Sequence, residues 1–209
     1  MAASVRDKHG VLTTLGDRKP VVIELGCGNH KSHPEALGVD ALDSAAVDLV
    51  GDAIEVLRCF SAASVQRVTS SHFLEHVVDL DGLLAEVSRV LVDNGTFDAV
   101  VPHFSNPYFY SDPTHRRTFG LYSFAYLAEG SGLHRGVPRY GKDFGLVIDG
   151  VDLVFTSPFT VRRWAKRAWG GWVNLGAYTR ELYEENLCYL VPCYEVRYTL
   201  HRRARTSAP

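Results

Sequence analysis

Features that mark several large protein classes are missing from this sequence. It contains no apolar run long enough to span a bilayer, and its start, MAASVRDKHG, lacks the apolar stretch of a secretion signal. Its four cysteines show none of the paired spacings of a metal site, so we expect reduced thiols. These absences lead us to expect a soluble protein of the cytoplasm.

An excess of charge of one sign is also missing. The chain has 22 Lys and Arg against 24 Asp and Glu, a formal net charge of −2, which argues against a general nucleic-acid-binding protein. Its 46% hydrophobic and 22% charged residues are typical of a globular protein. Because 209 residues suffice for one substantial core, and no linker or repeat interrupts them, we expect a single domain.

What the sequence does contain is a series of short apolar runs that alternate with helical patterns, as in parallel α/β proteins. We expect strands at residues 21–25, 37–40, 47–50, 65–70, 96–102, 146–156 and 194–200. Apolar residues repeat at helical spacing from Leu80 to Leu91, behind Asp79 as an N-cap, and another helix is expected at 54–63. The alternation predicts an α/β fold.

The stretch VVIELGCGNHKSHPEALGVD, residues 21–40, has the outline of a nucleotide-binding unit without its third glycine. The turn Gly26-x-Gly28 lets a ligand come close to the backbone. Only eleven residues separate Gly28 from Asp40, whereas a helical crossover needs about a dozen or more. We therefore expect a shortened first crossover, and not the pyrophosphate site of a nicotinamide-dependent oxidoreductase.

Polar residues follow four of the predicted strands, at Gly26–Lys31, Asp40, Asp52 and Ser70–His72. In an open parallel sheet these ends face one crevice. Asp40 could accept hydrogen bonds from ribose hydroxyls, Asp52 could accept one from an adenine amine, and Lys31 could meet a carboxylate. Each acid alone could equally be a solvated turn residue. Together they suit a nucleoside with a charged amino-acid tail.

Five motifs carry a resemblance to a known family. They are IELGCG (23–28), GVD (38–40), VGDA (50–53), SSHFLEHV (70–77) and LLAEVSRVLVDNG (83–95). In order and spacing they resemble the class I (Rossmann-like) S-adenosylmethionine-dependent methyltransferases, of the type 11-like kind, over residues 20–105. The family's usual Lys-Pro-Gly-Gly ending is replaced by Asp93-Asn94-Gly95, in a surface turn.

The resemblance implies a three-layer Rossmann-like α/β fold of about seven mostly parallel strands, with an antiparallel last strand at Tyr194–Leu200. It implies S-adenosylmethionine as the cofactor. The glycine loop would shape the methionine end, Asp40 would bind the ribose, and Asp52 would bind the adenine. The cofactor-binding residues are predicted to be Glu24, Gly26, Cys27, Gly28, Lys31, Asp40, Asp52, Ala53, Ser70, Ser71 and His72.

The segment VPHFSNPYFYSDPTHRRTFG, residues 101–120, follows a predicted strand at the same sheet edge, and we interpret residues 103–145 as the acceptor side. His103, Asp112 and His115 are candidate bases for an acceptor that must lose a proton. For any single histidine, a structural hydrogen bond is the more frequent role. The predicted substrate-binding residues are Tyr108, Tyr110 and Arg116.

A metal site is considered and not expected. His72 and His76 are spaced so that both would face one side of a helix, with Glu75 adjacent. No third ligand with diagnostic spacing follows, so we predict no bound metal.

The C-terminal region, 146–205, contains TVRRWAKRAWGGW at 160–172. A helix there places Val161, Trp164, Ala165 and Ala168 on one face and four basic residues on the other. Such a helix could contact an anionic membrane surface. The more ordinary interpretation is a short helix that covers the sheet with its basic face in solvent and ends before Gly170-Gly171.

The function predicted from these observations is methyl transfer from S-adenosylmethionine to an oxygen or nitrogen of a small-molecule, saccharide or lipid-linked acceptor. The alternative is a catalytically degenerate methyltransferase-fold protein that serves as a cofactor-binding or membrane-associated scaffold.

Overall fold

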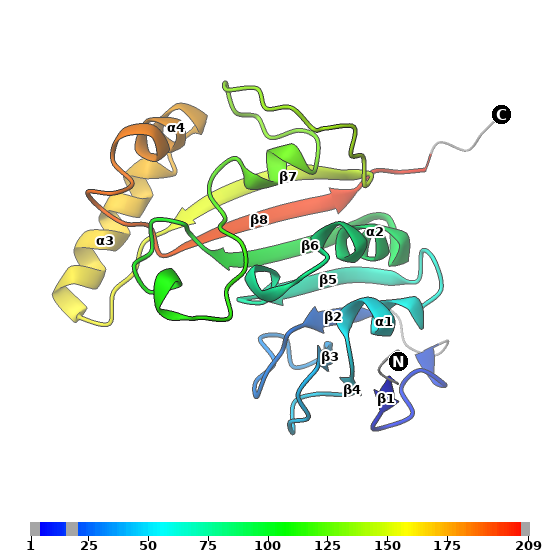
Figure 1. Ribbon diagram of the computed structural model, residues 1–209. Helices are drawn as coiled ribbons and strands as arrows, with labels where there is room; N and C mark the ends of the chain where they lie inside the picture. The colour runs from blue at the N-terminus through cyan, green and yellow to red at the C-terminus, as the bar shows by residue number, and fades with distance from the viewer. Residues whose placement is uncertain (1–4, 16–20, 206–209) are drawn as a thin grey trace.

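The computed structural model describes residues 5–15 and 21–205, which form one sheet of eight strands with helices packed against it (Figure 1). The strands are β1 (Arg6–Asp7), β2 (Val22–Leu25), β3 (Leu37–Asp40), β4 (Leu49–Val50), β5 (Val65–Ser71), β6 (Leu91–Pro102), β7 (Leu146–Val154) and β8 (Glu195–Arg202). The α-helices are α1 (Ala53–Arg58), α2 (Leu80–Val90), α3 (Thr160–Val173) and α4 (Ala177–Asn186). Short 3-10 helices lie at Leu74–His76, Phe109–Ser111 and Ser123–Tyr126.

The strand order is β1-β4-β3-β2-β5-β6-β8-β7. The strands β4, β3, β2, β5 and β6 run parallel, and β8 is antiparallel to both of its neighbours, β6 and β7. This confirms the predicted mostly parallel α/β sheet with an antiparallel last strand. One strand more than expected is present, because Arg6 pairs with Val50 and adds the two-residue β1 at the edge.

Helix α2 forms where the apolar spacing predicted a helix. Leu83, Leu84 and Val87 are buried against the sheet, and the side chain of Asp79 accepts a hydrogen bond from the backbone N of Gly82 at 2.8 Å. This satisfies one of the amide groups left free at the helix start. Helix α1 ends at Arg58, five residues before the predicted end.

The first crossover, between β2 and β3, contains no helix, as its length predicted. Its fold depends on a buried carboxylate: Glu24 accepts hydrogen bonds from the backbone N of Ser32 at 2.9 Å and of His33 at 3.0 Å. These bonds replace the internal hydrogen bonds that a helix would supply.

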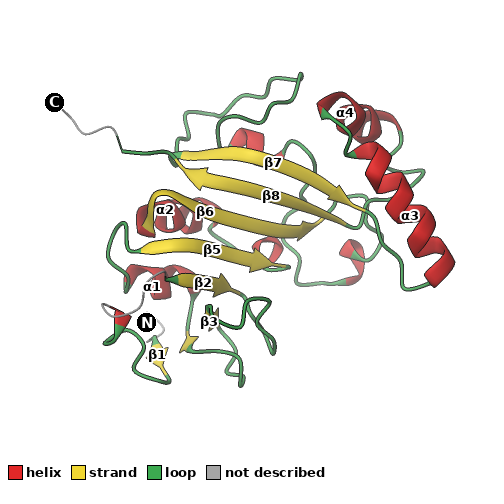
Figure 2. Cartoon of the chain, turned by 180° about the vertical axis from the view of Figure 1, so that it is seen from behind, coloured by secondary structure: helices red, strands yellow, loops and turns green. Residues whose placement is uncertain are grey.

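The two faces of the sheet differ. Helices α1 and α2 lie on one face, together with the segment 103–145, whose Phe124 packs on Tyr198 of β8 with ring centroids 4.4 Å apart (Figure 1). The opposite face of β5–β8, which Figure 2 shows toward the viewer, carries polar side chains such as the ion pair Arg67–Asp98 at 2.8 Å.

The predicted three layers are therefore reduced to two over β5–β8. The reason lies in the two crossovers that would supply helices to the second face. The connection from β2 to β3 and the eight residues from β3 to β4 are too short for a helix and its turns. A sheet that alternates buried and polar residues can leave one face in water.

Helices α3 and α4 pack together beyond the ends of β7 and β8 (Figure 2). Asn174 at the end of α3 is joined to the backbone of Leu153 in β7 through both its amide oxygen, at 2.9 Å, and its amide nitrogen, at 2.7 Å. α3 runs through Gly170-Gly171, where the sequence predicted its end, because Gly170 packs against Phe155 with no room for a larger side chain.

The carboxylate of Glu181 in α4 binds the backbone of the neighbouring loop at His134 and Arg135. Burial alone would raise the pKa of Glu181, but hydrogen bonds from the backbone and side chains of His134, Arg135 and Tyr122 lower it to about 2. Because the folded pKa lies below the ordinary value of 4.5, the stabilising contribution is complete above that value and is lost as the pH falls toward 2.

We therefore expect Glu181→Gln to lower the free energy of unfolding at neutral pH by roughly 1–3 kcal/mol. The variant should also lose less stability than the parent between about pH 5 and about pH 3. Urea unfolding at several pH values measures both effects. Equal pH dependence of the two proteins would contradict the role given to Glu181.

Candidate functional site

The carboxyl ends of β2, β3, β4 and β5 lie at one edge of the sheet, and a cavity of about 260 Å³ opens there. Among its lining residues are Asp40 after β3, Asp52 and Ala53 after β4, and Phe73 after β5. The structure thus brings together three residues that the sequence predicted for cofactor binding. Phe73 was not predicted, although it stands between the polar residues of the motif SSHFLEHV.

The turn between β2 and the first crossover forms one wall of this site. Gly26 has a φ of +68°, and a Cβ at this position would lie 2.6 Å from the Phe73 ring. Gly28 has a φ of +54°, and its backbone N donates to Asp40 at 2.9 Å. The turn therefore requires glycine at Gly26 for both conformation and space, and Asp40 holds the turn against β3.

The two acids differ in how their oxygens are used. Asp40 accepts from Gly28 through one oxygen and from the backbone N of Leu42 through the other, both at 2.9 Å. Asp52 is the N-cap of α1, and a single oxygen accepts from the backbone of Ile54 and Glu55. Its second oxygen remains available to a ligand, and the capping bonds fix the orientation of the carboxylate.

Two of the predicted cofactor residues have other roles. The ammonium of Lys31 binds the backbone O of Ala36 at 2.9 Å and Asp48 at 3.0 Å, so it cross-links the first crossover instead of facing the cavity. This corrects the prediction that Lys31 meets the carboxylate of a ligand, since its partner is the carboxylate of Asp48. Cys27 is buried, and burial, then Asp40 and Glu24, raise the pKa of its thiol to about 11. The thiol therefore stays protonated and packs within the turn.

Ser70 and His72, two of the residues predicted to bind the cofactor, stand at and just after the end of β5. Ser70 is buried, and its hydroxyl has no hydrogen-bond partner among the described residues. His72 has a φ of +51° and lies 3.1 Å from Glu195. The hydrogen bond that His72 donates to Glu195, and then the nearby Glu75, raise the pKa of His72 to about 9. His72 is consequently an imidazolium at neutral pH and does not act as a base.

A second cavity of about 620 Å³ touches the predicted acceptor segment at one residue. Tyr108 lines it together with Tyr194, Arg163 and Arg167. The other two predicted substrate residues, Tyr110 and Arg116, are exposed outside its lining. Arginines from α3 beside tyrosines suit a polar or anionic acceptor.

Asp112 and His115 lie together in this segment. Nε2 of His115 is 3.7 Å from Asp112, and Nδ1 lies 2.8 Å from the backbone O of Phe109. Hydrogen bonds from the side chain and backbone of Thr114 lower the pKa of Asp112. Both candidate bases are therefore near one another and reach the protein surface.

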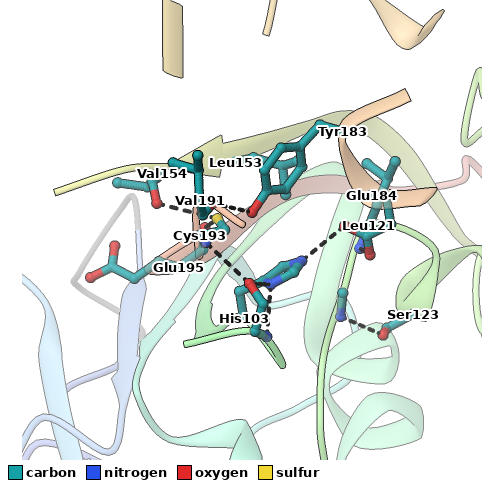
Figure 3. A network of polar contacts seen from close by, with 12 residues as sticks. His103, Leu121, Ser123, Leu153, Val154, Tyr183, Glu184, Val191, Cys193 and Glu195 are labelled. Atoms are coloured by element: carbon teal, nitrogen blue, oxygen red, sulfur yellow. Dashed lines mark hydrogen bonds and ion pairs between the residues drawn. The ribbon is translucent and has the colours of Figure 1, made fainter. Parts of the chain in front are cut away.

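His103, the third candidate base, is buried in a polar network (Figure 3). Its side chain is 0% exposed, Nδ1 lies 2.8 Å from Ser105, and Nε2 lies 2.9 Å from Glu184. Glu184 also accepts a hydrogen bond from the backbone N of Leu121 at 2.8 Å. A base must reach the substrate, so the prediction that His103 is catalytic is wrong, and His103 instead joins β6 to α4.

Replacing His103 with alanine should lower the free energy of unfolding by about 2–4 kcal/mol, because the change leaves a cavity and removes a partner from Glu184 and Ser105. Urea unfolding measures this. His201→Ala, which removes a partly exposed ion pair with Asp149, is the matched control and should cost less than about 1 kcal/mol. Equal losses in the two variants would contradict the structural role.

Comparison with known proteins gives one family match. Residues 23–99 match the model of a family described as a methyltransferase domain. The match spans the glycine turn, both acids of the cavity and most of β6, and it confirms the predicted enzyme class and its cofactor, S-adenosylmethionine. No curated protein matches the sequence significantly.

Solved structures of methyltransferases resemble the whole chain. A SAM dependent methyltransferase from Archaeoglobus fulgidus is 17% identical, with a TM-score of 0.54 over 92% of this chain and 93% of its own. A complex of the Trm112 methyltransferase activator with a putative methyltransferase from Haloferax volcanii gives 16% identity and a TM-score of 0.55, over 98% and 92% of the two chains. A putative methyltransferase from Bacillus halodurans gives 14% and 0.53, over 93% and 99%. At these identities the likeness shows the fold alone.

Within the described part of the chain, no helix is both long and apolar enough to cross a membrane.

Proposed function

We propose that this chain transfers the methyl group of S-adenosylmethionine to an oxygen or nitrogen of a small-molecule, saccharide or lipid-linked acceptor. The observation that carries the proposal is the 260 Å³ cavity at the strand ends, where Asp40 and Asp52 meet beside the turn of Gly26. Two fixed carboxylates and an apolar ring, Phe73, are the groups that a ribose and an adenine require.

The residues present fit the cofactor in the following way. Asp40 would accept from the ribose hydroxyls, and the free oxygen of Asp52 would accept from the adenine amine. Phe73 would pack on the adenine, and the turn at Gly26–Gly28 would pass close to the methionine end. The cofactor supplies an electrophilic methyl group on a sulfonium. The chain must hold the methyl group in line with the acceptor atom and exclude water.

Removal of a proton from the acceptor would fall to Asp112 or His115. Both lie in the segment after β6, and both keep an atom free for a substrate: Nε2 in His115 and the second carboxylate oxygen in Asp112. The 620 Å³ cavity beside Tyr108 would hold the acceptor, and Arg167 would pair with an anionic group on it.

The exposed face of α3 supports a lipid-linked acceptor. The residues that share its apolar face, Val161, Trp164, Ala165 and Ala168, are all exposed, with Val161 at 82% and Trp164 at 69%. The interpretation that this face covers the sheet is therefore wrong. An exposed tryptophan flanked by Arg162 and Arg167 suits insertion into an anionic lipid surface, and Arg167 also lines the acceptor cavity.

Binding to lipid vesicles tests this surface. We expect the protein to sediment with phosphatidylglycerol vesicles and not with phosphatidylcholine vesicles. Trp164→Ala should weaken that binding by about 10-fold or more, since the indole supplies much of the inserted apolar area. Leu42→Ala, at an exposed apolar residue distant from α3 in the sequence, is the control. Unchanged vesicle binding by the Trp164 variant would contradict the proposed contact between α3 and a membrane.

Methyl transfer itself is tested with S-adenosylmethionine that carries a labelled methyl group. The acceptor panel should contain polar lipids, phosphorylated saccharides and small hydroxylated or amino compounds. We expect label in one class, and its loss in Asp40→Ala but not in Asp81→Ala, which changes an exposed acid paired with Lys142. Cofactor binding without transfer to any class would favour the scaffold alternative.

A further inference from the structure

We propose that Glu75, His76 and His115 bind one divalent transition-metal ion, for which Zn²⁺ is the best fit. One ligand atom from each of the three side chains lies within 4.8 Å of the others. Glu75 and His76 belong to the short helix Leu74–His76 after β5, and His115 belongs to the segment that follows β6. This binding site goes beyond the proposed methyl transfer and does not depend on it. An ion bound there would occupy Nε2 of His115, so the role of base would fall to Asp112.

The first argument is the state of Glu75. Its side chain is 0% exposed, and neither carboxylate oxygen has a hydrogen-bond partner among the described residues. The nearest ring nitrogens are Nδ1 of His72 at 3.6 Å and Nε2 of His115 at 3.9 Å, both beyond hydrogen-bond distance. His72 is already bonded to Glu195, and the buried carboxylate of Glu75 accepts no hydrogen bond, a state that is costly and therefore rare in folded proteins. A cation between Glu75 and His115 would compensate that cost.

The second argument is the orientation of the two histidines. Nδ1 of His115 lies 2.8 Å from the backbone O of Phe109, which can only accept, so the neutral ring carries its proton there. Nδ1 of His76 lies 2.9 Å from the hydroxyl of Thr114, whose own proton is donated to Asp112. In both rings Nε2 therefore keeps a free lone pair. Metal-binding histidines are commonly fixed in this way by a partner on the other nitrogen.

The ligand set indicates the type of ion. Two imidazoles and one carboxylate suit Zn²⁺ better than Mg²⁺ or Ca²⁺, which prefer oxygen ligands. Ligand atoms around a tetrahedral Zn²⁺ lie about 3.4 Å apart, so the three side chains would need only small movements to close on the ion.

The position of the site suggests what the ion does. His76 lines the 260 Å³ cavity, and His115 and Asp112 lie in the predicted acceptor segment. An ion bound by both elements would hold residues 109–116 against the end of β5. The sequence predicted no metal, because His115 lies 39 residues beyond His76 and no local spacing connects the two.

The test is an equilibrium titration of the full chain with Zn²⁺, after removal of metal with a chelator and without S-adenosylmethionine. Competition with a chelating dye gives the affinity and the number of ions. We expect one ion per chain, and about 100-fold weaker binding or worse in Glu75→Gln and in His115→Gln. His201→Gln, which removes a histidine outside the cluster, should bind as the parent does.

A second variant, which changes none of the proposed ligands, tests the site if Glu75→Gln does not fold. Thr114→Val leaves every proposed ligand in place and removes the hydroxyl that bonds His76 and Asp112, so it should weaken binding by about 10–100-fold. Zn²⁺ should also raise the Tm of the parent and not that of His115→Gln. Fewer than one ion per parent chain, or equal affinities of the parent and His115→Gln, would overturn the proposal. Because no methyl donor is present, failure here leaves the proposed function untouched.

Discussion

Gly26→Ala should lower the affinity for S-adenosylmethionine by at least about 10-fold and the free energy of unfolding by about 2–5 kcal/mol. Two costs add at this position. An alanine at a φ of +68° is strained, and its Cβ would meet the Phe73 ring at 2.6 Å. Because Phe73 lines the cavity, a movement of its ring changes the surface offered to the adenine.

Gly28→Ala is the matched control. Its φ of +54° imposes the same kind of strain, but a Cβ there meets no atom within 4 Å. We expect a loss of only about 1–2 kcal/mol in stability and little change in cofactor affinity. Calorimetric titration and urea unfolding of both variants separate the cost of backbone strain from the cost of the contact with Phe73. If Gly26→Ala and Gly28→Ala behaved alike, the contact between the turn and Phe73 would not shape the site.

Asp40→Ala should weaken cofactor binding by roughly 100-fold. The carboxylate holds Gly28 and Leu42 through two hydrogen bonds and, in the proposed complex, also accepts from the ribose. The alanine variant loses all of these interactions. Asp40→Asn keeps one acceptor oxygen and should fall between the parent and Asp40→Ala, as measured by calorimetric titration.

Asp43→Ala is the control for this prediction. Asp43 is three residues further along the chain and forms exposed ion pairs with Arg6 and Lys8. Exposed pairs contribute little to stability, so we expect cofactor affinity close to that of the parent. Equal weakening in the Asp40 and Asp43 variants would show that the loop, and not the Asp40 carboxylate, determines binding.

Much of the fold could be predicted because its signals are local. The apolar spacing of Leu83, Leu84 and Val87 places α2, and the short distance from Gly28 to Asp40 excludes a helix in the first crossover. Helix α3 shows the limit of such signals. The side chains that share its apolar face were predicted correctly, but the face that lies in solvent was not, because burial depends on which elements happen to pack nearby.

The same difference between local signals and tertiary contacts applies to the residues of the site. That Asp40, Asp52 and Ala53 lie together could be predicted because they stand at strand ends, and parallel strands end at one edge. The roles of Lys31 and His103 were misjudged because their partners, Asp48 and Glu184, come from other elements. The cluster of Glu75 and His115 was missed for the same reason, since only tertiary structure brings these residues together.

Calorimetric titration with S-adenosylmethionine, S-adenosylhomocysteine and NADH tests the central claim most directly. The account predicts that both adenosyl ligands bind with one site per chain, that NADH does not bind, and that Asp40→Ala loses the binding of both. Binding of NADH in place of the adenosyl ligands, or S-adenosylmethionine binding that is unaffected by Asp40→Ala, would contradict it.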